Sequence, residues 1–160
     1  MDIQVSSNFE RLLFEASDRK PNEVVGQMSA LAREGSFTIP EWALARIRAD
    51  FDAFRVDEPA CAEEMGRIYR TSGTIIDPHT AVGVHAARKA LAASPATPVI
   101  ALATAHPAKF PDAVAAATGV RPPLPERLSD LMERKEAIAV LPNNCRAVVD
   151  YLRQTARVAA

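Results

Sequence analysis

The chain has 160 residues, a formal net charge of −1, and charged side chains at 24% of its positions. This balance does not suggest a nucleic-acid partner or an anionic membrane, because both select clustered positive charge. No apolar run approaches the roughly 18 residues of a membrane-spanning helix, and the N-terminus lacks the basic start and apolar core of a signal peptide. We therefore expect a cytoplasmic domain, with Cys61 and Cys145 buried and reduced.

The first 70 residues predict a short strand followed by four helices. The strand is "MDIQV" (residues 1–5). Ser7 and Glu10 have the spacing of a capping box, so Ser7 is expected to be the N-cap of the first helix. The three further helices are expected after Pro21, from Trp42 to Phe51, and after the break at residues 55–59.

The second half alternates apolar runs with helices. "TIID" (residues 74–77) and "AIAVL" (residues 137–141) predict short strands, and "VIALAT" (residues 99–104) has the continuous apolar character of a strand buried on both faces of a parallel sheet. Strands separated by helices indicate an α/β fold with a few parallel strands. The helices are expected from Pro78 to about Ala93, after Pro111, around Leu124 to Met132, and after an Asn143 or Asn144 cap.

Two of these apolar runs end in similar polar segments, "DPHT" (residues 77–80) and "TAHP" (residues 104–107). Ligands of parallel α/β sheets bind beyond the carboxyl ends of the strands, so the two junctions predict a shared site. The helix that begins at Pro78 offers free N–H groups and the positive end of its dipole, which favours an anion near His79 and Thr80.

A plainer interpretation of both junctions stays open at this point. In it, Asp77 is only a helix cap, His79 is an exposed first-turn residue, and Thr80 bonds locally. Thr104 is then a core threonine and His106 a loop histidine. His85, further along the same helix, is expected at the surface.

Four stretches carry a resemblance to a known family: "MDIQVSSNFERLL", "IRADF", "IDPHTAVG" and "LATAHPAKFPDAV". They resemble threonine synthase, in the right order and over essentially the whole chain, and the match is to the longer branch of that family. The resemblance implies the tryptophan-synthase-β-like fold, which is fold type II of the pyridoxal 5'-phosphate enzymes. It also implies the conversion of O-phosphohomoserine and water into threonine and phosphate.

The resemblance assigns a role to one residue. In this fold the pyridine nitrogen of the cofactor meets a Ser or Thr hydroxyl, and the similar position here is Thr104. With the helix N-terminus that favours an anion, the substrate and its phosphate are expected near His79, Thr80, His106 and Lys109.

The family also uses a Schiff-base lysine and a glycine-rich phosphate cradle, and neither motif is matched in this sequence. None of Lys20, Lys89, Lys109 and Lys135 stands in the Schiff-base context. We therefore expect residues 1–160 to be a single compact segment from the C-terminal portion of a threonine synthase, inactive alone and inclined to self-associate. The alternative is a non-catalytic truncated relative that acts as a ligand-binding or interaction module.

Overall fold

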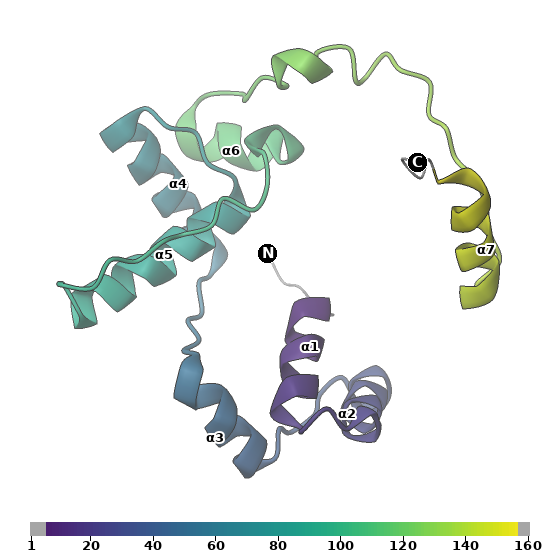
Figure 1. Ribbon diagram of the computed structural model, residues 1–160. Coiled ribbons are helices and arrows are strands. Elements are labelled where there is room, and N and C mark those ends of the chain that lie inside the picture. The colour runs from purple at the N-terminus through teal and green to yellow at the C-terminus, as the bar shows by residue number, and fades with distance from the viewer. Residues whose placement is uncertain (1–5, 157–160) are drawn as a thin grey trace. The chain divides into compact units, whose positions relative to one another are not determined.

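The computed structural model describes residues 6–156, and within this range it contains helices and connecting segments but no β-strand (Figure 1). The expected strands at residues 74–77, 99–104 and 137–141 are therefore wrong for the described chain. A strand is stable only beside a hydrogen-bonded neighbour, and none of these segments has one there. The strand expected at residues 1–5 lies outside the described residues.

The chain divides into two compact units, Met1–Pro123 and Leu124–Ala160. In the first unit, α1 (Ser7–Ala16) contacts both α2 (Pro21–Glu34) and α3 (Glu41–Asp50). The N-cap of α1 is Ser6 and not the expected Ser7, because the Ser6 hydroxyl accepts a hydrogen bond from the backbone N–H of Phe9 at 3.4 Å. The buried apolar residues of these helices are Leu13, Ala16, Val24 and Ala43.

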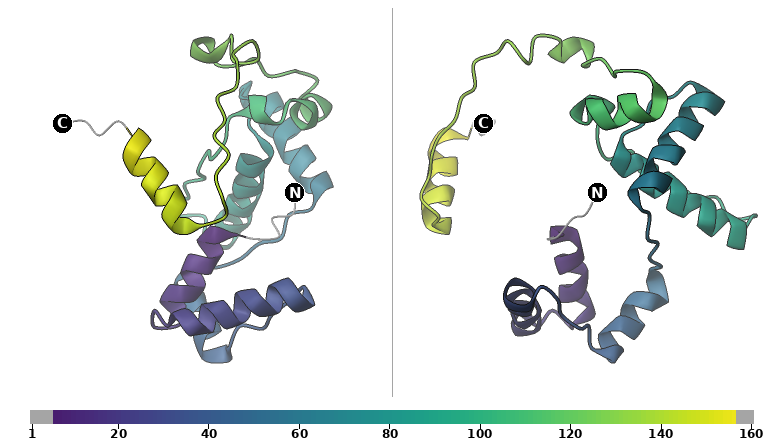
Figure 2. Two further views of the ribbon diagram at one scale, coloured as in Figure 1. Left: turned by 90° about the vertical axis from the view of Figure 1, so that its right-hand side faces the viewer. Right: turned by 180° about the vertical axis from the view of Figure 1, so that it is seen from behind.

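The other helices of this unit pack around α4 (Glu58–Ser72), which contacts α5 (Pro78–Ala93) and α6 (Pro111–Thr118) (Figure 2). Their buried core consists of Cys61, Met65, Ala81 and Val114. The approach of α4 to α6 depends on Gly66, since a Cβ at this position would lie only 2.8 Å from the carbonyl oxygen of Ala117. This packing buries the first turn of α5, where Pro78, Thr80 and Ala81 are buried.

The second unit contains little regular structure. The helix expected around Leu124 to Met132 is only a 3-10 turn, η2 (Glu126–Leu128). The last helix, α7 (Cys145–Thr155), is capped by Asn144, whose side-chain oxygen accepts from the backbone N–H of Ala147 at 3.1 Å. Cys145 is exposed, so its expected burial is wrong, whereas Cys61 is buried as predicted.

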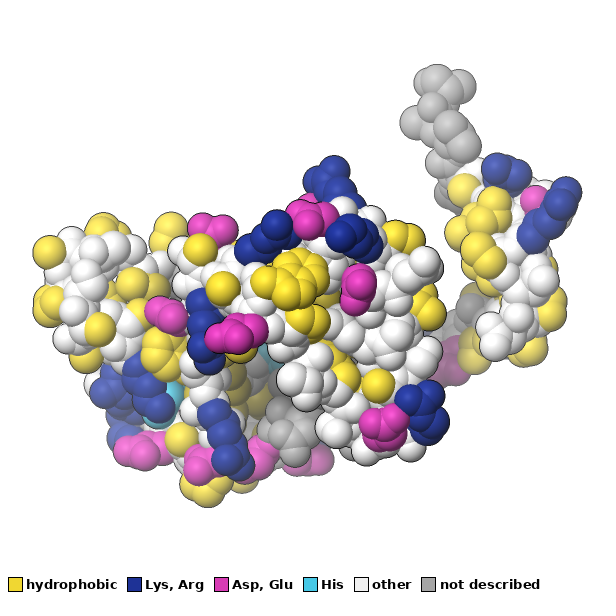
Figure 3. Space-filling view, turned by 90° about the horizontal axis from the view of Figure 1, so that it is seen from below, with side chains coloured by type: hydrophobic (Ala, Val, Ile, Leu, Met, Phe, Trp, Pro, Cys, Tyr) yellow, Lys and Arg dark blue, Asp and Glu magenta, His cyan; other side chains and the backbone are white. Residues whose placement is uncertain are grey.

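Residues 99–104, which were expected to be a buried strand, are exposed, and so are residues 137–140 of the segment 137–141, which was expected to be a short strand. The exposed fraction is 86% for Ile100 and 73% for Leu102 in the first, and 76% for Ile138 and 93% for Val140 in the second. Hydrophobic side chains accordingly lie among charged ones at the surface (Figure 3). In the described part of the chain, no helix is long and apolar enough to cross a membrane.

Candidate functional site

The first junction is organised by Asp77, which is 1% exposed and caps α5. Its Oδ1 atom accepts from the backbone N–H groups of His79, at 2.9 Å, and Thr80, at 3.4 Å. Its Oδ2 atom accepts from the hydroxyl of Thr80. An ionised carboxylate has only acceptor positions, and here these positions meet three donors of the helix N-terminus. Asp77 is therefore the polar centre of the junction.

His79 is the side chain that this junction presents outward. Its Nδ1 atom lies 3.1 Å from Oδ1 of Asp77, and 29% of the side chain is exposed. The ring also packs against Phe110, with 4.9 Å between ring centroids and a tilt of 53°. Phe110 follows the turn η1 (Pro107–Lys109), so this contact places His79 beside a residue three positions after the second polar segment.

The second junction is more open than the first. Thr104, His106 and Lys109 are all exposed. The Nδ1 atom of His106 accepts a hydrogen bond from the backbone N–H of Ala108 at 3.2 Å and so caps η1. Lys109 and Thr104 thus present their polar groups at the surface, next to the segment that carries Phe110.

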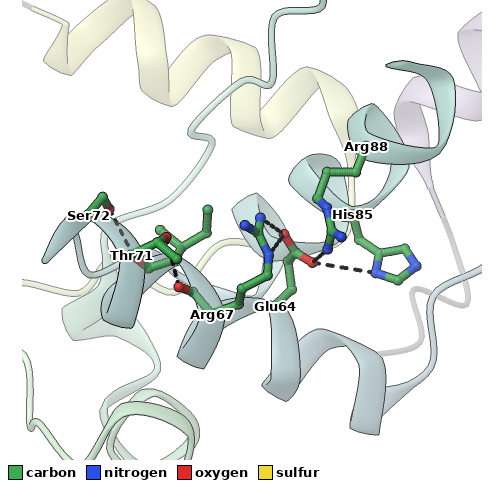
Figure 4. A network of polar contacts seen from close by, with 7 residues as sticks. Glu64, Arg67, Thr71, Ser72, His85 and Arg88 are labelled. Carbon is green, nitrogen blue, oxygen red and sulfur yellow. Dashed lines mark hydrogen bonds and ion pairs between the residues drawn. The ribbon is translucent and has the colours of Figure 1, made fainter. Parts of the chain in front are cut away.

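A buried carboxylate on α4 fixes the position of α5. Glu64 is 2% exposed and binds Arg67 of its own helix and Arg88 of α5, the latter at 2.8 Å from Nη1 to Oε2 (Figure 4). Nδ1 of His85 lies 3.7 Å from the same Oε2. Burial acts to raise the pKa of Glu64, but the hydrogen bonds and charges of the two arginines outweigh it, so its pKa is lowered. Glu64 therefore ties α5 to α4 as a carboxylate.

Cys61 of α4 contacts the N-terminus of α5. Its Sγ atom donates to the backbone carbonyl of Pro78 at 3.4 Å. Burial, with the nearby charge of Asp77, raises the pKa of the thiol, so Cys61 is a neutral packing residue and not a nucleophile.

The structure places the expected site residues at the two junctions. His79 meets the second junction through Phe110, whereas the hydroxyl of Thr80 is donated to Asp77, as the plainer interpretation of this residue predicts. Thr104, His106 and Lys109 share the open segment after α5. His85 is only partly exposed, at 22% of its side chain, because it packs beside Glu64; its expected surface position is therefore wrong in part.

Sequence reasoning missed two contributions to this region. It recognised Asp77 as a cap but not as the partner of the His79 ring, although an Asp two residues before a His at a helix N-terminus allows that contact. It also overlooked Glu64, for which the spacing to Arg67 is a signal of an i,i+3 pair. The contact with Arg88, which lies 24 positions away, has no local signal.

Comparison with known proteins supports the resemblance found in the sequence. The family model "Threonine synthase, C-terminal" matches residues 80–152. The threonine synthase of Pseudomonas aeruginosa is 42% identical over 155 residues, which are 96% of this chain and 33% of that protein. The threonine synthase of Saccharomyces cerevisiae is 38% identical over 129 residues, which cover 71% of this chain and 25% of that protein.

Solved structures give the same result. One match is the crystal structure of threonine synthase from Brucella melitensis with pyridoxal phosphate bound, which is 47% identical in sequence with a TM-score of 0.68. The match covers 99% of this chain and 34% of that chain. The crystal structure of yeast threonine synthase is 34% identical in sequence with a TM-score of 0.66, and the match covers 85% of this chain and 31% of that chain. The chain thus spans about a third of the length of the relatives it matches. It belongs to the threonine synthase family and corresponds to the C-terminal part of its members.

Proposed function

We propose that this chain forms one wall of the cofactor and substrate site of a threonine synthase, which converts O-phosphohomoserine and water into threonine and phosphate. The reaction is that of a carbon–oxygen lyase acting on a phosphate ester. The observation that carries the proposal is the match of 99% of this chain, at 47% identity, to a threonine synthase that has pyridoxal phosphate bound. The cytoplasmic location stays a prediction.

Thr104 fits the cofactor in its chemistry. Its hydroxyl is exposed at the open junction, where a pyridine nitrogen can meet it as a neutral hydrogen-bond partner. Pyridoxal phosphate, when bound, supplies an electron sink for the substrate carbon. Lys20, Lys89, Lys109 and Lys135 are all exposed, and none stands in the Schiff-base motif of the family. We therefore assign covalent attachment to the family's upstream region and expect residues 1–160 to be inactive alone.

The substrate phosphate is assigned to the groups that remain available at the two junctions. His79 and His106 offer ring nitrogens, and Lys109 offers a positive charge beside them. Thr80 contributes indirectly, since its hydroxyl donates to Asp77 and keeps that carboxylate in place. A phosphate here would also lie near the positive end of α5, which favours negative charge.

The exposed apolar segments suggest a further property of the chain alone. Ile100 and Leu102 project from residues 99–104, which form no strand in the described structure. Exposed apolar segments of this kind pair with one another when no other partner covers them. We propose that residues 99–104 cause the separate chain to self-associate.

The decisive experiment replaces the matching third of the Pseudomonas aeruginosa enzyme by this chain and measures phosphate release from O-phosphohomoserine. We expect an active chimera in which Thr104→Val lowers turnover by about 10- to 100-fold, since an unpaired polar group costs ~1–3 kcal/mol. The matched control is Thr97→Val, because Thr97 is an exposed threonine whose hydroxyl lies 2.9 Å from that of Ser94. A folded chimera that binds pyridoxal phosphate but releases no phosphate would instead favour the non-catalytic binding module.

A second experiment tests covalent attachment in the separate chain. The chain is incubated with pyridoxal phosphate, treated with borohydride and analysed by mass spectrometry. We expect no stoichiometric lysine adduct. A stoichiometric adduct that disappears in Lys109→Arg would show that this segment carries the Schiff-base lysine and would overturn our assignment.

A further inference from the structure

The ring of His79 lies in a setting that determines which nitrogen carries the proton. Its Nδ1 atom is 3.1 Å from Oδ1 of Asp77, a carboxylate that also faces the N–H groups of His79 and Thr80 and the hydroxyl of Thr80. An ionised carboxylate only accepts hydrogen bonds. Nδ1 of His79 must therefore be the donor. In the neutral ring, Nε2 then has no proton and is an acceptor.

The ring of His106 is held in the opposite way. Its Nδ1 atom accepts from the backbone N–H of Ala108 at 3.2 Å. A neutral imidazole carries one proton, so a lone pair on Nδ1 places that proton on Nε2. The outer nitrogen of His106 is therefore a donor, whereas the outer nitrogen of His79 is an acceptor. The two rings belong to neighbouring segments, since His79 packs on Phe110, four positions after His106.

We propose that Asp77 is a positioning residue that keeps His79 in its Nδ1–H tautomer, so that the site contains two histidines of opposite character. In their neutral forms, His79 accepts a proton or a hydrogen bond at Nε2, and His106 donates a hydrogen bond from Nε2. The ligand group suited to this arrangement carries an acidic proton beside an anionic oxygen, as singly protonated phosphate does. This part rests on the proposed function, whereas the tautomers themselves follow from the two contacts with Nδ1.

The arrangement gives His79 a different task from that of a cationic clamp. A protonated histidine would donate from both nitrogens and attract any anion. In its neutral form, His79 held through Nδ1 has a free lone pair at Nε2, which accepts a hydrogen bond from a ligand oxygen that still has its proton and can take up that proton in a reaction. Lys109, which is exposed in the same segment as His106, supplies the positive charge for the anionic oxygens.

The test is nitrogen NMR on the whole chain, which contains three histidines. Ring 15N signals of protonated and unprotonated nitrogens are well separated, and His79→Gln, His85→Gln and His106→Gln assign them. Near pH 9, where an ordinary imidazole is neutral, we expect the Nδ1–H form for His79 and the Nε2–H form for His106. The Nε2–H form of His79 would overturn the proposal even without further variants.

Asp77→Asn tests the positioning role, since asparagine remains a good helix cap but replaces the carboxylate. We expect the Nδ1–H population of His79 to fall below about half while His85 and His106 keep their signals. The control is Asp57→Asn, because Asp57 caps α4 through the backbone N–H of Ala60 and has no histidine partner in its capping contact. An unchanged His79 in a folded Asp77→Asn variant would contradict the positioning role.

Inorganic phosphate separates this inference from the proposed function. Added to the 15N-labelled chain, it should shift the Nε2 signals of both His79 and His106. If the tautomers are as stated but neither signal moves, the shared ligand is wrong and the role of Asp77 stands. If both signals move but His79 carries its proton on Nε2, phosphate binds and the proposal on Asp77 is wrong.

Discussion

The two junctions look alike in the sequence and differ in the structure. Each has an apolar run followed by a polar segment with a histidine next to a proline, Asp-Pro-His at the first and Thr-Ala-His-Pro at the second. At the first, Asp77 is 1% exposed and the adjoining Ala81 is 0% exposed. At the second, Ile100 is 86% exposed and Thr104 lies at the surface. The same local pattern therefore ends in a packed core in one place and in an open segment in the other.

The difference lies in the partner that each segment finds. Helix α5 has α4 beside it, so Ala81 packs with Met65 in one buried cluster and Glu64 binds Arg88 across the two helices. Residues 99–104 find no strand in the described chain to pair with. An apolar pattern indicates only that burial of the segment lowers the free energy. The residues that bury it have to come from other parts of the structure.

The largest expected effect comes from two methionines that differ in burial. Met65 is 3% exposed in the α4 core, whereas Met132 in the second unit is 79% exposed. We expect Met65→Ala to lower the free energy of unfolding by about 2–4 kcal/mol, because it leaves a cavity. Met132→Ala should change it by less than about 0.5 kcal/mol. Chemical denaturation followed by circular dichroism measures both, and equal losses would contradict the contrast between core and open segments.

Two helix caps provide the next test of the first junction. Asp77 is buried and accepts from the backbone N–H groups of His79 and Thr80 and from the Thr80 hydroxyl, whereas Asp57 is exposed and accepts from the backbone N–H of Ala60 at 3.0 Å. Asp77→Ala should therefore cost about 2–3 kcal/mol, since it leaves buried donors unpaired. Asp57→Ala should cost about 1 kcal/mol, the ordinary value for a lost cap. If the two variants unfold at the same denaturant concentration, the burial of Asp77 has no energetic consequence.

The ion pair between α4 and α5 predicts a dependence on pH. Glu64→Gln is expected to lower the free energy of unfolding at pH 7 by about 1–2 kcal/mol, because a neutral amide replaces the buried partner of Arg67 and Arg88. The control is Glu15→Gln, since Glu15 and its partner Arg19 are exposed and such pairs contribute less than about 1 kcal/mol.

The sign of the pH effect follows from the lowered pKa of Glu64. The folded state binds the proton of Glu64 less readily than the unfolded state does, so the stabilisation is complete above the unfolded pKa of about 4.3 and is lost as pH falls through the lower, folded pKa. The difference between wild type and Glu64→Gln should thus be constant near neutral pH and disappear in acid. A difference that grows as pH falls would refute this role.

A substitution at the second junction is expected to have the smallest effect on stability. It should still have a clear effect on self-association of the chain. Ile100→Asp should change the free energy of unfolding by less than about 0.5 kcal/mol, since Ile100 is 86% exposed. It should nevertheless reduce self-association measured by light scattering over a range of concentrations. The control is Val25→Asp on α2, where Val25 is 62% exposed. A chain that is monomeric at every concentration would show that residues 99–104 do not self-associate.

Local chemistry in the sequence predicted much of the helical structure. The Asp77 cap followed by Pro78 places the start of α5, and the prediction that this helix ends near Ala93 is confirmed. Of the two possible caps of the last helix, Asn144 is the one used. These features depend on residues within one helical turn, where propensity and capping operate directly. The contact of His79 with Phe110 was not predictable, because it joins residues 31 positions apart.

The sequence by itself determined where most of the helices begin and which family the chain resembles, because caps, prolines and long motifs are local. Tertiary structure decided which apolar faces are covered. Met65 is buried because α5 and α6 pack on α4. Leu102 stays exposed although its neighbours in the sequence are apolar. It also decided the chemistry of the first junction, since packing buries Asp77, the carboxylate beside the His79 ring. Burial is a property of the neighbours that a segment finds, and a sequence pattern does not contain those neighbours.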